Sequence, residues 1–216
     1  MMPWEAFFDE AVRQAVLPGS SVLDIGAGLR VDGSRGNVVD STRAWIKPLL
    51  EQATYVVMDP VDTYHPDIVA DVMDMPSVAS ASFDTVFCLA VLEHVPRPWD
   101  AMREIHRVLK PGGTFVGYVP FLSPYHGMPG YYGDFFRYTD EGVRSICSGF
   151  VDVRLVPVRG PVETLVHLLP GTLPRRLLGG LVRRIDGIRR SSGHQVSGYT
   201  FTAKKALNND NTHTNL

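Results

Sequence analysis

The feature that most constrains the fold of this chain is an apolar run ending in a glycine turn, followed later by an apolar run ending in an aspartate. The first is Ser21-Val22-Leu23-Asp24-Ile25-Gly26-Ala27-Gly28, and the second is Tyr55-Val56-Val57-Met58 before Asp59. Short apolar runs of this kind are typical of buried parallel strands, whose carboxyl ends meet at one edge of an open α/β sheet. Because that edge is where such sheets bind nucleoside-containing ligands, we expect a nucleoside site there.

The composition of the turn and of the strand end indicates which nucleoside ligand fits. Glycines let the backbone approach a ligand without a Cβ in the way, and an acidic side chain ending the next strand can accept both hydroxyls of a ribose. The third glycine of a dinucleotide fingerprint is missing, because Val31 occupies its place. The sequence therefore disfavours a dinucleotide.

Three further segments follow in a characteristic order. They are Asp67 to Pro76, Ser82 to Val95 with its Leu92-Glu93-His94-Val95, and the turn Leu109-Lys110-Pro111-Gly112-Gly113. In order and spacing they resemble the third strand, the fourth strand and the turn before the fifth strand in class I S-adenosylmethionine-dependent methyltransferases of the type 11 kind. The resemblance covers residues 20–120 and resumes at 198–205, which is similar to the last strand of that fold.

The resemblance implies a Rossmann-like, doubly wound α/β fold with S-adenosyl-L-methionine as the cofactor. The expected sheet has seven strands and is mostly parallel, with an antiparallel last strand. Only 12 residues separate Asp59 from Asp71, too few for a full helix between two strands, so we expect the helix after the second strand to be reduced. The longer polar segment from Leu29 to Trp45 is expected to lie over the methionine end of the cofactor, or else to be a solvated loop.

The expected cofactor-binding residues lie at the ends of the first four predicted strands. Asp59 is predicted to hold the ribose, Asp71 and Val72 to line the adenine, and Leu89 and Ala90 to pack nearby. The full set is Asp24, Gly26, Ala27, Gly28, Asp59, Pro60, Asp71, Val72, Leu89 and Ala90. No metal site is predicted.

The acceptor is expected to dock on the aromatic-rich segment that follows the fifth strand, residues 118–139. Its "PYH" and "DFFRYT" stretches resemble loops of small-molecule methyltransferases, including many that act on sugars and glycan precursors. We predict His126 as the general base, with His94 as the rival base or as a cap of the following helix. The predicted acceptor-binding residues are Tyr125, Tyr131, Tyr132, Asp134 and Arg137. Asp134 and Arg137, three residues apart, could instead pair with each other.

Composition agrees with one globular domain. The chain has 216 residues, 44% of them hydrophobic and 20% charged, and a net charge of −2, which argues against a protein that tracks nucleic acid by charge alone. We expect a domain over 1–205 and a disordered tail over 206–216. Two cysteines without a disulfide or metal pattern, together with an amino terminus that has no export signal, indicate a cytoplasmic location.

A basic insertion interrupts the domain over 157–195, as a helical insertion or lid. Its arginines and apolar residues recur at helical spacing near 173–190, and they are Arg175, Arg176, Leu177, Leu181, Val182, Arg183, Arg184, Ile185, Ile188, Arg189 and Arg190. This amphipathic pattern fits a helix packed on the domain with a solvated arginine face, or one that contacts a membrane surface. The oligomeric state is left open.

The function that these features favour is methyl transfer from S-adenosyl-L-methionine to a small polar acceptor, most of all a hydroxyl of a sugar or glycan precursor. A nucleic-acid methyltransferase, acting on RNA, is the first alternative. It is weakened because the fourth strand continues as Cys88-Leu89-Ala90-Val91, without an Asn/Asp-Pro-Pro-aromatic motif or a Pro-Cys nucleophile. A non-catalytic S-adenosylmethionine-binding protein is the second alternative, and it would be favoured if packing closed the segment 118–139.

Overall fold

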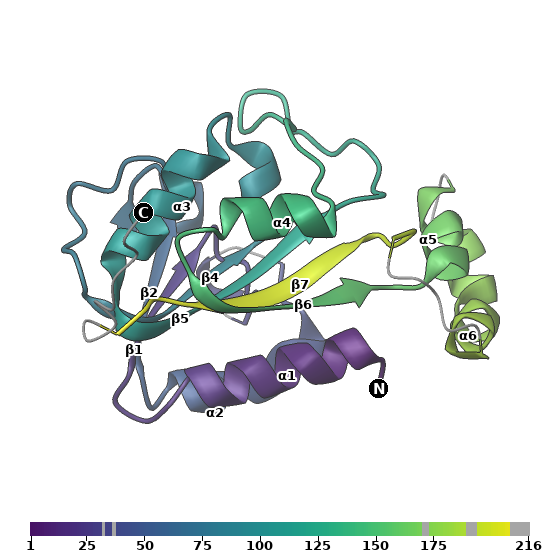
Figure 1. Ribbon diagram of the computed structural model, residues 1–216, viewed down its shortest axis with the longest axis horizontal. Coiled ribbons are helices and arrows are strands. Elements are labelled where there is room, and N and C mark those ends of the chain that lie inside the picture. Colours follow the sequence, from purple (N-terminus) through teal and green to yellow (C-terminus); the bar gives the residue numbers. More distant parts are fainter. Residues whose placement is uncertain (32, 36–37, 170–172, 189–193, 208–216) are drawn as a thin grey trace, which may run out of the picture.

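A seven-stranded sheet forms the centre of the computed structural model, which describes residues 1–31, 33–35, 38–169, 173–188 and 194–207 (Figure 1). The strand order is β3-β2-β1-β4-β5-β7-β6, and β1 to β5 pair in parallel, whereas β7 is antiparallel to both β5 and β6. The strands are β1 (Ser21–Ile25), β2 (Thr54–Asp59), β3 (Ile68–Val69), β4 (Phe83–Leu89), β5 (Leu109–Pro120), β6 (Val151–Val158) and β7 (Gly198–Lys204). The expected fold is confirmed.

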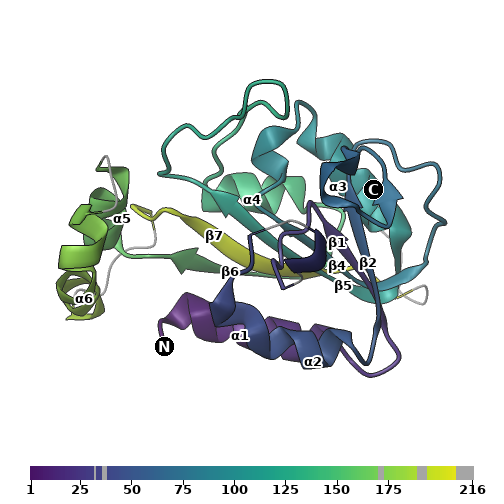
Figure 2. The same ribbon diagram turned by 180° about the vertical axis from the view of Figure 1, so that it is seen from behind.

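Helices cover both faces of this sheet. The long helix α1 (Pro3–Ala15) and the short α2 (Lys47–Leu50) lie on one face, and α3 (Pro98–Val108) and α4 (Asp140–Ile146) lie on the other (Figures 1 and 2). The central strand β4 supplies both cores, because successive side chains of a strand point to opposite faces. Val86 and Cys88 enter the core under α3 and α4, and Phe87 and Leu89 enter the core under α1.

The connection between β2 and β3 is as short as the sequence predicts. It contains only the 3-10 turn η3 (Asp62–Tyr64) in place of a full helix. The longer connection between β1 and β2 contains η1 (Gly33–Arg35), η2 (Ser41–Ile46) and α2. Both connections leave the carboxyl edge of the sheet, so they lie where the predicted nucleoside site is.

Two helices, rather than one, form the insertion between β6 and β7. They are α5 (Pro161–Leu168) and α6 (Leu173–Ile188), and they lie beyond the ends of β6 and β7, away from the rest of the molecule (Figure 1). The buried carboxylate of Asp186 in α6 accepts hydrogen bonds from the backbone N–H groups of Val162 and Glu163, at the start of α5.

One arginine of this insertion, Arg183, is paired with an acidic residue of the same insertion, Glu163. The Nε atom of Arg183 lies 3.1 Å from the Glu163 carboxylate, while Leu165 and Leu181 are exposed. Contact of this helix pair with a membrane surface stays a prediction. Its residues 170–172 and 189–193, with residues 208–216 of the expected tail, lie outside the described residues.

None of the described helices combines the length and the apolar character that a membrane span requires. Both cysteines, Cys88 and Cys147, are free thiols buried in the core.

Candidate active site at the carboxyl edge of the sheet

Asp24, in β1, fixes the glycine turn that follows this strand by hydrogen bonds. This side chain is fully buried, and its carboxylate accepts hydrogen bonds from the backbone N–H of Gly28 (3.0 Å) and Leu29 (3.1 Å) and from the hydroxyl of Tyr55 (2.7 Å). Gly26 and Ala27 take up left-handed conformations (φ 75° and 49°), which makes the turn tight. Asp24 therefore holds the turn in shape, and a cofactor contact by this residue stays a prediction.

Burial raises the pKa of Asp24 to about 6, because removing its charge from water outweighs the hydrogen bonds that it accepts. A carboxyl whose pKa is raised on folding stabilises the fold fully below its usual pKa near 3.8, and that contribution disappears as the pH rises through 6. We expect the free energy of unfolding to fall by about 2 kcal/mol between pH 4 and pH 7 relative to Asp24→Asn, which stays neutral. Urea unfolding of both proteins at several pH values measures this difference, and parallel pH profiles would contradict it.

Asp59 and the segment after β3 lie side by side at the same edge. Asp59 ends β2, its carboxylate accepts a hydrogen bond from the N–H of Val61 (3.1 Å), and its half-buried position raises its pKa. The backbone carbonyl of Asp59 accepts from Ala70 (3.1 Å), so Asp71 follows directly beside the predicted ribose ligand. Asp71 is exposed, whereas the Val72 side chain is buried in the core. The placement of Asp59, Pro60 and Asp71 thus agrees with a nucleoside site.

The end of β4 packs directly against the glycine turn. A Cβ added to Gly28 would lie 2.8 Å from the Cβ of Leu89, a distance that no real side chain tolerates, so only glycine fits at this position. Ala90, which follows Leu89, also has a left-handed conformation (φ 57°). The predicted cofactor residues from β1 and β4 therefore meet at one point.

A cavity of about 700 Å³ opens beside this meeting point, and Gly28, Leu89 and Ala90 form one of its walls. Residues from three other parts of the chain complete it, including Trp4, Glu5, Phe8 and Asp9 of α1, Arg30, Asp40 and Arg43 of the β1–β2 connection, and Tyr118 and Arg159 near the ends of β5 and β6. The lining is therefore both aromatic and charged. The sequence did not predict the contribution of α1, because an amphipathic helix pattern does not show which part of the sheet the helix covers.

The segment from Leu29 to Trp45 crosses this edge of the sheet. Near one end, Arg43 donates a hydrogen bond to the carbonyl of Gly28 (2.7 Å), and near the middle, Arg35 pairs with Asp67 between η3 and β3 (2.9 Å). These contacts hold the segment against both the glycine turn and the β2–β3 connection. The segment is therefore not a purely solvated loop, and its position over the methionine end of the cofactor stays a prediction.

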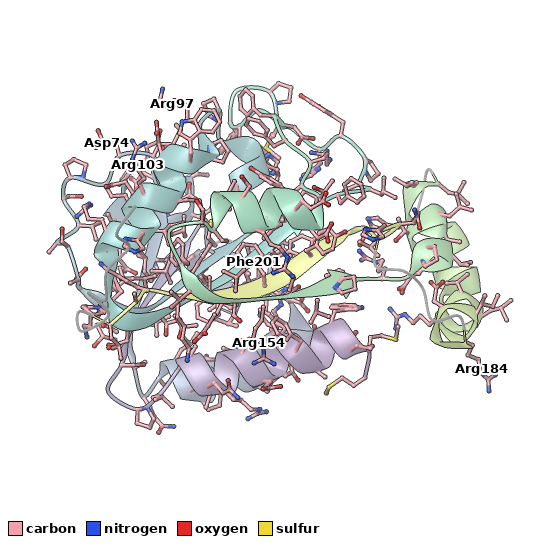
Figure 3. The ribbon with its side chains drawn as sticks, viewed as in Figure 1. Asp74, Arg97, Arg103, Arg154, Arg184 and Phe201 are labelled. Atoms are coloured by element: carbon pink, nitrogen blue, oxygen red, sulfur yellow. The ribbon has the colours of Figure 1, made fainter. Side chains whose placement is uncertain are left out.

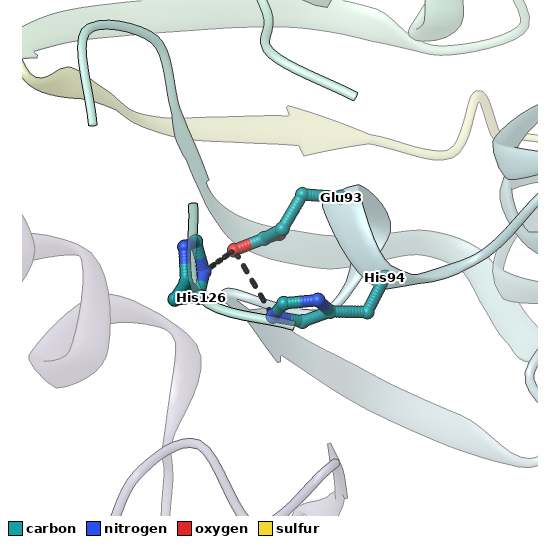
Figure 4. Close-up of side chains that lie close together, drawn as sticks. All are labelled: Glu93, His94 and His126. Carbon is teal, nitrogen blue, oxygen red and sulfur yellow. Dashed lines mark ion pairs between the residues drawn. The ribbon is translucent and has the colours of Figure 1, made fainter. Parts of the chain in front are cut away.

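Three side chains gather where the 3-10 turn η4 (Leu92–His94) meets the segment after β5, and Figure 4 shows them together. The buried carboxylate oxygen Oε1 of Glu93 lies 3.6 Å from Nε2 of His126 and 3.9 Å from Nε2 of His94. The Glu93 carboxylate raises the pKa of His126 above its usual value. Both predicted candidate bases are thus brought together, with an acid between them whose role the sequence analysis missed.

Asp134 and Arg137, which the sequence allowed either to bind the acceptor or to pair with each other, hold the acceptor segment (residues 118–139) in shape. Asp134 and Arg137 form an ion pair, and Arg137 holds the pKa of the Asp134 carboxyl well below its usual range. Asp134 also accepts a hydrogen bond from the backbone N–H of His126 (2.9 Å), and Arg137 donates to the carbonyl of Pro124 (3.0 Å). These two residues therefore bind each other and support the segment, which leaves acceptor contact by either of them a prediction.

The tyrosines of this segment lie around the three-residue cluster and over the cofactor edge. The Tyr132 ring lies 4.3 Å from the His94 ring, and the Tyr131 hydroxyl lies 3.0 Å from the Thr63 hydroxyl in η3. Tyr125 is 75% exposed and Tyr131 is 44% exposed, so packing does not close the segment. A segment closed by packing would have favoured a non-catalytic S-adenosylmethionine-binding protein, and the structure does not show one.

A seven-stranded sheet of this order, with a glycine turn and a strand-end aspartate at its carboxyl edge, defines the fold of class I S-adenosylmethionine-dependent methyltransferases. Comparison with known proteins agrees. Residues 42–117 match the family described as a methyltransferase domain. The chain is 34% identical over 104 residues to the ubiquinone biosynthesis O-methyltransferase of Pseudomonas syringae pv. tomato, a match that covers 46% of this chain and 44% of that protein.

Solved structures with low sequence identity share the fold. A methyltransferase from Archaeoglobus fulgidus aligns with a TM-score of 0.57 at 18% identity, over 93% of this chain and 94% of that one. The phosphoethanolamine N-methyltransferase 2 of Haemonchus contortus, solved with S-adenosylhomocysteine, aligns with a TM-score of 0.54 at 14% identity, over 94% of this chain and 53% of that one. The chain has the fold of class I S-adenosylmethionine-dependent methyltransferases, its residues 42–117 match the methyltransferase domain family, and it spans about half the length of the curated relatives that it matches.

Proposed function

We propose that this chain transfers the methyl group of S-adenosyl-L-methionine to a hydroxyl oxygen of a small polar acceptor. The observation that carries the proposal is the cavity at the carboxyl edge of the sheet, which shares Gly28, Leu89 and Ala90 with the predicted cofactor site. A donor bound over these residues would present its methyl group to whatever occupies the cavity. The curated relatives are named as O-methyltransferases, which supports oxygen as the methylated atom.

The cavity lining narrows the class of acceptor. Trp4 and Phe8 offer apolar faces, while Arg30, Asp40 and Arg159 offer charged groups that can hydrogen-bond hydroxyls. This mixture suits a sugar or a similar polyhydroxylated metabolite, which buries ring faces and pairs its hydroxyls at the same time. The curated relatives are named for ubiquinone biosynthesis and not for a sugar, so a phenolic acceptor is the competing class.

The residues have distinct roles in this proposal. S-adenosyl-L-methionine supplies an electrophilic methyl group on its sulfonium sulfur when bound. Asp59 and the glycine turn bind the donor, and Asp24 and Arg43 hold the turn in shape. The acceptor oxygen must lose its proton as it gains the methyl group. We propose that the cluster of Glu93, His94 and His126 accepts this proton, and His126 is the most exposed residue of the three.

A screen for S-adenosylhomocysteine release tests this function. Purified protein is incubated with S-adenosyl-L-methionine and panels of sugars, nucleotide sugars, phenols and short RNAs, with Asp59→Ala as the inactive control. Release that depends on a sugar or a nucleotide sugar, and is lost in the control, supports the proposal. Release with the phenols alone would move the acceptor to that class, and release with RNA alone would overturn the proposal.

A further inference from the structure

The side chain of Glu93 is a buried carboxyl group without a hydrogen-bond donor among the described residues. Glu93 is fully buried, and among the described residues neither of its carboxylate oxygens has a hydrogen-bond partner. Buried carboxylates in native proteins are paired, hydrogen-bonded or bound to a cation, since an isolated one costs several kcal/mol. The Nε2 atoms of His94 and His126 lie 3.9 and 3.6 Å from Oε1, and both distances are too long for a normal hydrogen bond.

The hydrogen bonds of the two histidines determine where their lone pairs point. The Nδ1 atom of His94 lies 2.7 Å from the carbonyl oxygen of Gly133, and the Nδ1 atom of His126 lies 3.0 Å from that of Pro124. A carbonyl oxygen only accepts, so each Nδ1 must carry the proton. In their neutral forms both histidines therefore direct an unprotonated Nε2 toward the same carboxylate oxygen, as Figure 4 shows.

This arrangement has the features of a metal site. Metal-binding histidines commonly donate their other ring N–H to a backbone carbonyl, which fixes the tautomer, and the carbonyls of Gly133 and Pro124 do this here. The three ligand atoms lie within 4.8 Å of one another. Two nitrogen or oxygen ligands of a tetrahedral Zn²⁺ lie about 3.4 Å apart, so small side-chain rotations bring this set to bonding distance.

We propose that Glu93, His94 and His126 bind a divalent first-row transition-metal cation such as Zn²⁺. Two imidazoles and one carboxylate are a ligand set that such ions prefer, whereas Mg²⁺ and Ca²⁺ prefer oxygen ligands alone. Glu93 and His94 come from η4, and His126 comes from the acceptor segment, so the ion ties this segment to the end of β4. Three protein ligands leave at least one coordination position for water or an acceptor oxygen.

The competing occupant of the cluster is a proton. Protonated His126 would form an ion pair with Glu93 and leave no room for a cation. A proton and a metal are distinguished by direct titration, because only the metal form has a ligand-field spectrum and a binding stoichiometry.

The test is titration of the metal-free full chain with Co²⁺, followed by absorbance, and with Zn²⁺, followed by calorimetry. We expect one ion per chain, visible d–d bands, and a rise in the melting temperature with Zn²⁺. His126→Gln and Glu93→Gln each remove one ligand and should weaken Co²⁺ binding by at least roughly 100-fold, beyond the 10- to 100-fold typical of outer-shell changes. None of these readouts needs methyl transfer.

A matched control distinguishes this site from weak surface binding. His194 is exposed and lies 3.8 Å from the Asp140 carboxylate, so it offers a histidine–carboxylate pair without the third ligand. His194→Gln should leave Co²⁺ binding unchanged. If Glu93→Gln fails to fold, the half-exposed His126→Gln decides the question. Wild-type protein without Co²⁺ bands, or a His126→Gln protein that binds Co²⁺ like the wild type, would overturn the site.

Discussion

Asp59→Ala is expected to weaken binding of S-adenosylhomocysteine by about 2–4 kcal/mol, a loss of roughly 30- to 1000-fold in affinity. The reason is the position of the carboxylate at the end of β2, beside the segment that leads to Asp71, where it can accept charge-assisted hydrogen bonds from both ribose hydroxyls. The measurement is calorimetric titration of both proteins with S-adenosylhomocysteine.

The control is Asp62→Ala. Asp62 is an exposed carboxylate three residues further along, in η3, and not at the end of a strand. Its removal should change the affinity little if the strand-end position matters, and as much as Asp59→Ala if only negative charge near the edge matters. Unchanged affinity in a folded Asp59→Ala protein would rule out the ribose assignment.

The second large effect concerns the transfer step. His126→Ala should lower turnover roughly 10²- to 10⁴-fold and leave affinity for S-adenosylhomocysteine almost unchanged, because this residue acts on the acceptor's proton, as a base or as a ligand of an ion that lowers the acceptor's pKa, and not on the donor. Its imidazole belongs to the acceptor segment and lies beside the buried Glu93 carboxylate. Single-turnover kinetics with an acceptor from the screen measure the change.

Two variants separate catalysis from support of the segment. His94→Ala removes a ring whose Nδ1 is bound to the carbonyl of Gly133, so it should loosen the segment and alter KM as well as kcat. His194→Ala, outside the cluster, should keep wild-type turnover. Near-wild-type turnover in His126→Ala would remove this residue from the chemistry and leave His94 or simple proximity of the reactants as the explanation.

The strands and most helices were predictable because their signals are local. The five residues before Gly26 and the five before Asp59 are mostly apolar, as in buried strands, and the helix around Ile105 repeats its apolar residues at helical spacing. The shortened connection after β2 followed from chain length alone. The insertion was less predictable, since its apolar pattern did not show that Asp186 would bind the start of a separate helix α5.

The sequence by itself determined the class of fold, the glycine turn, the strand-end aspartate and the segment that carries His126. The tertiary structure alone decided that Tyr55 would support Asp24, that α1 would wall the cavity, and that Glu93 would be buried between two histidines. The physical reason is range: strand and turn formation depend on neighbouring residues, whereas a site depends on which distant segments the packed core brings to the same edge of the sheet.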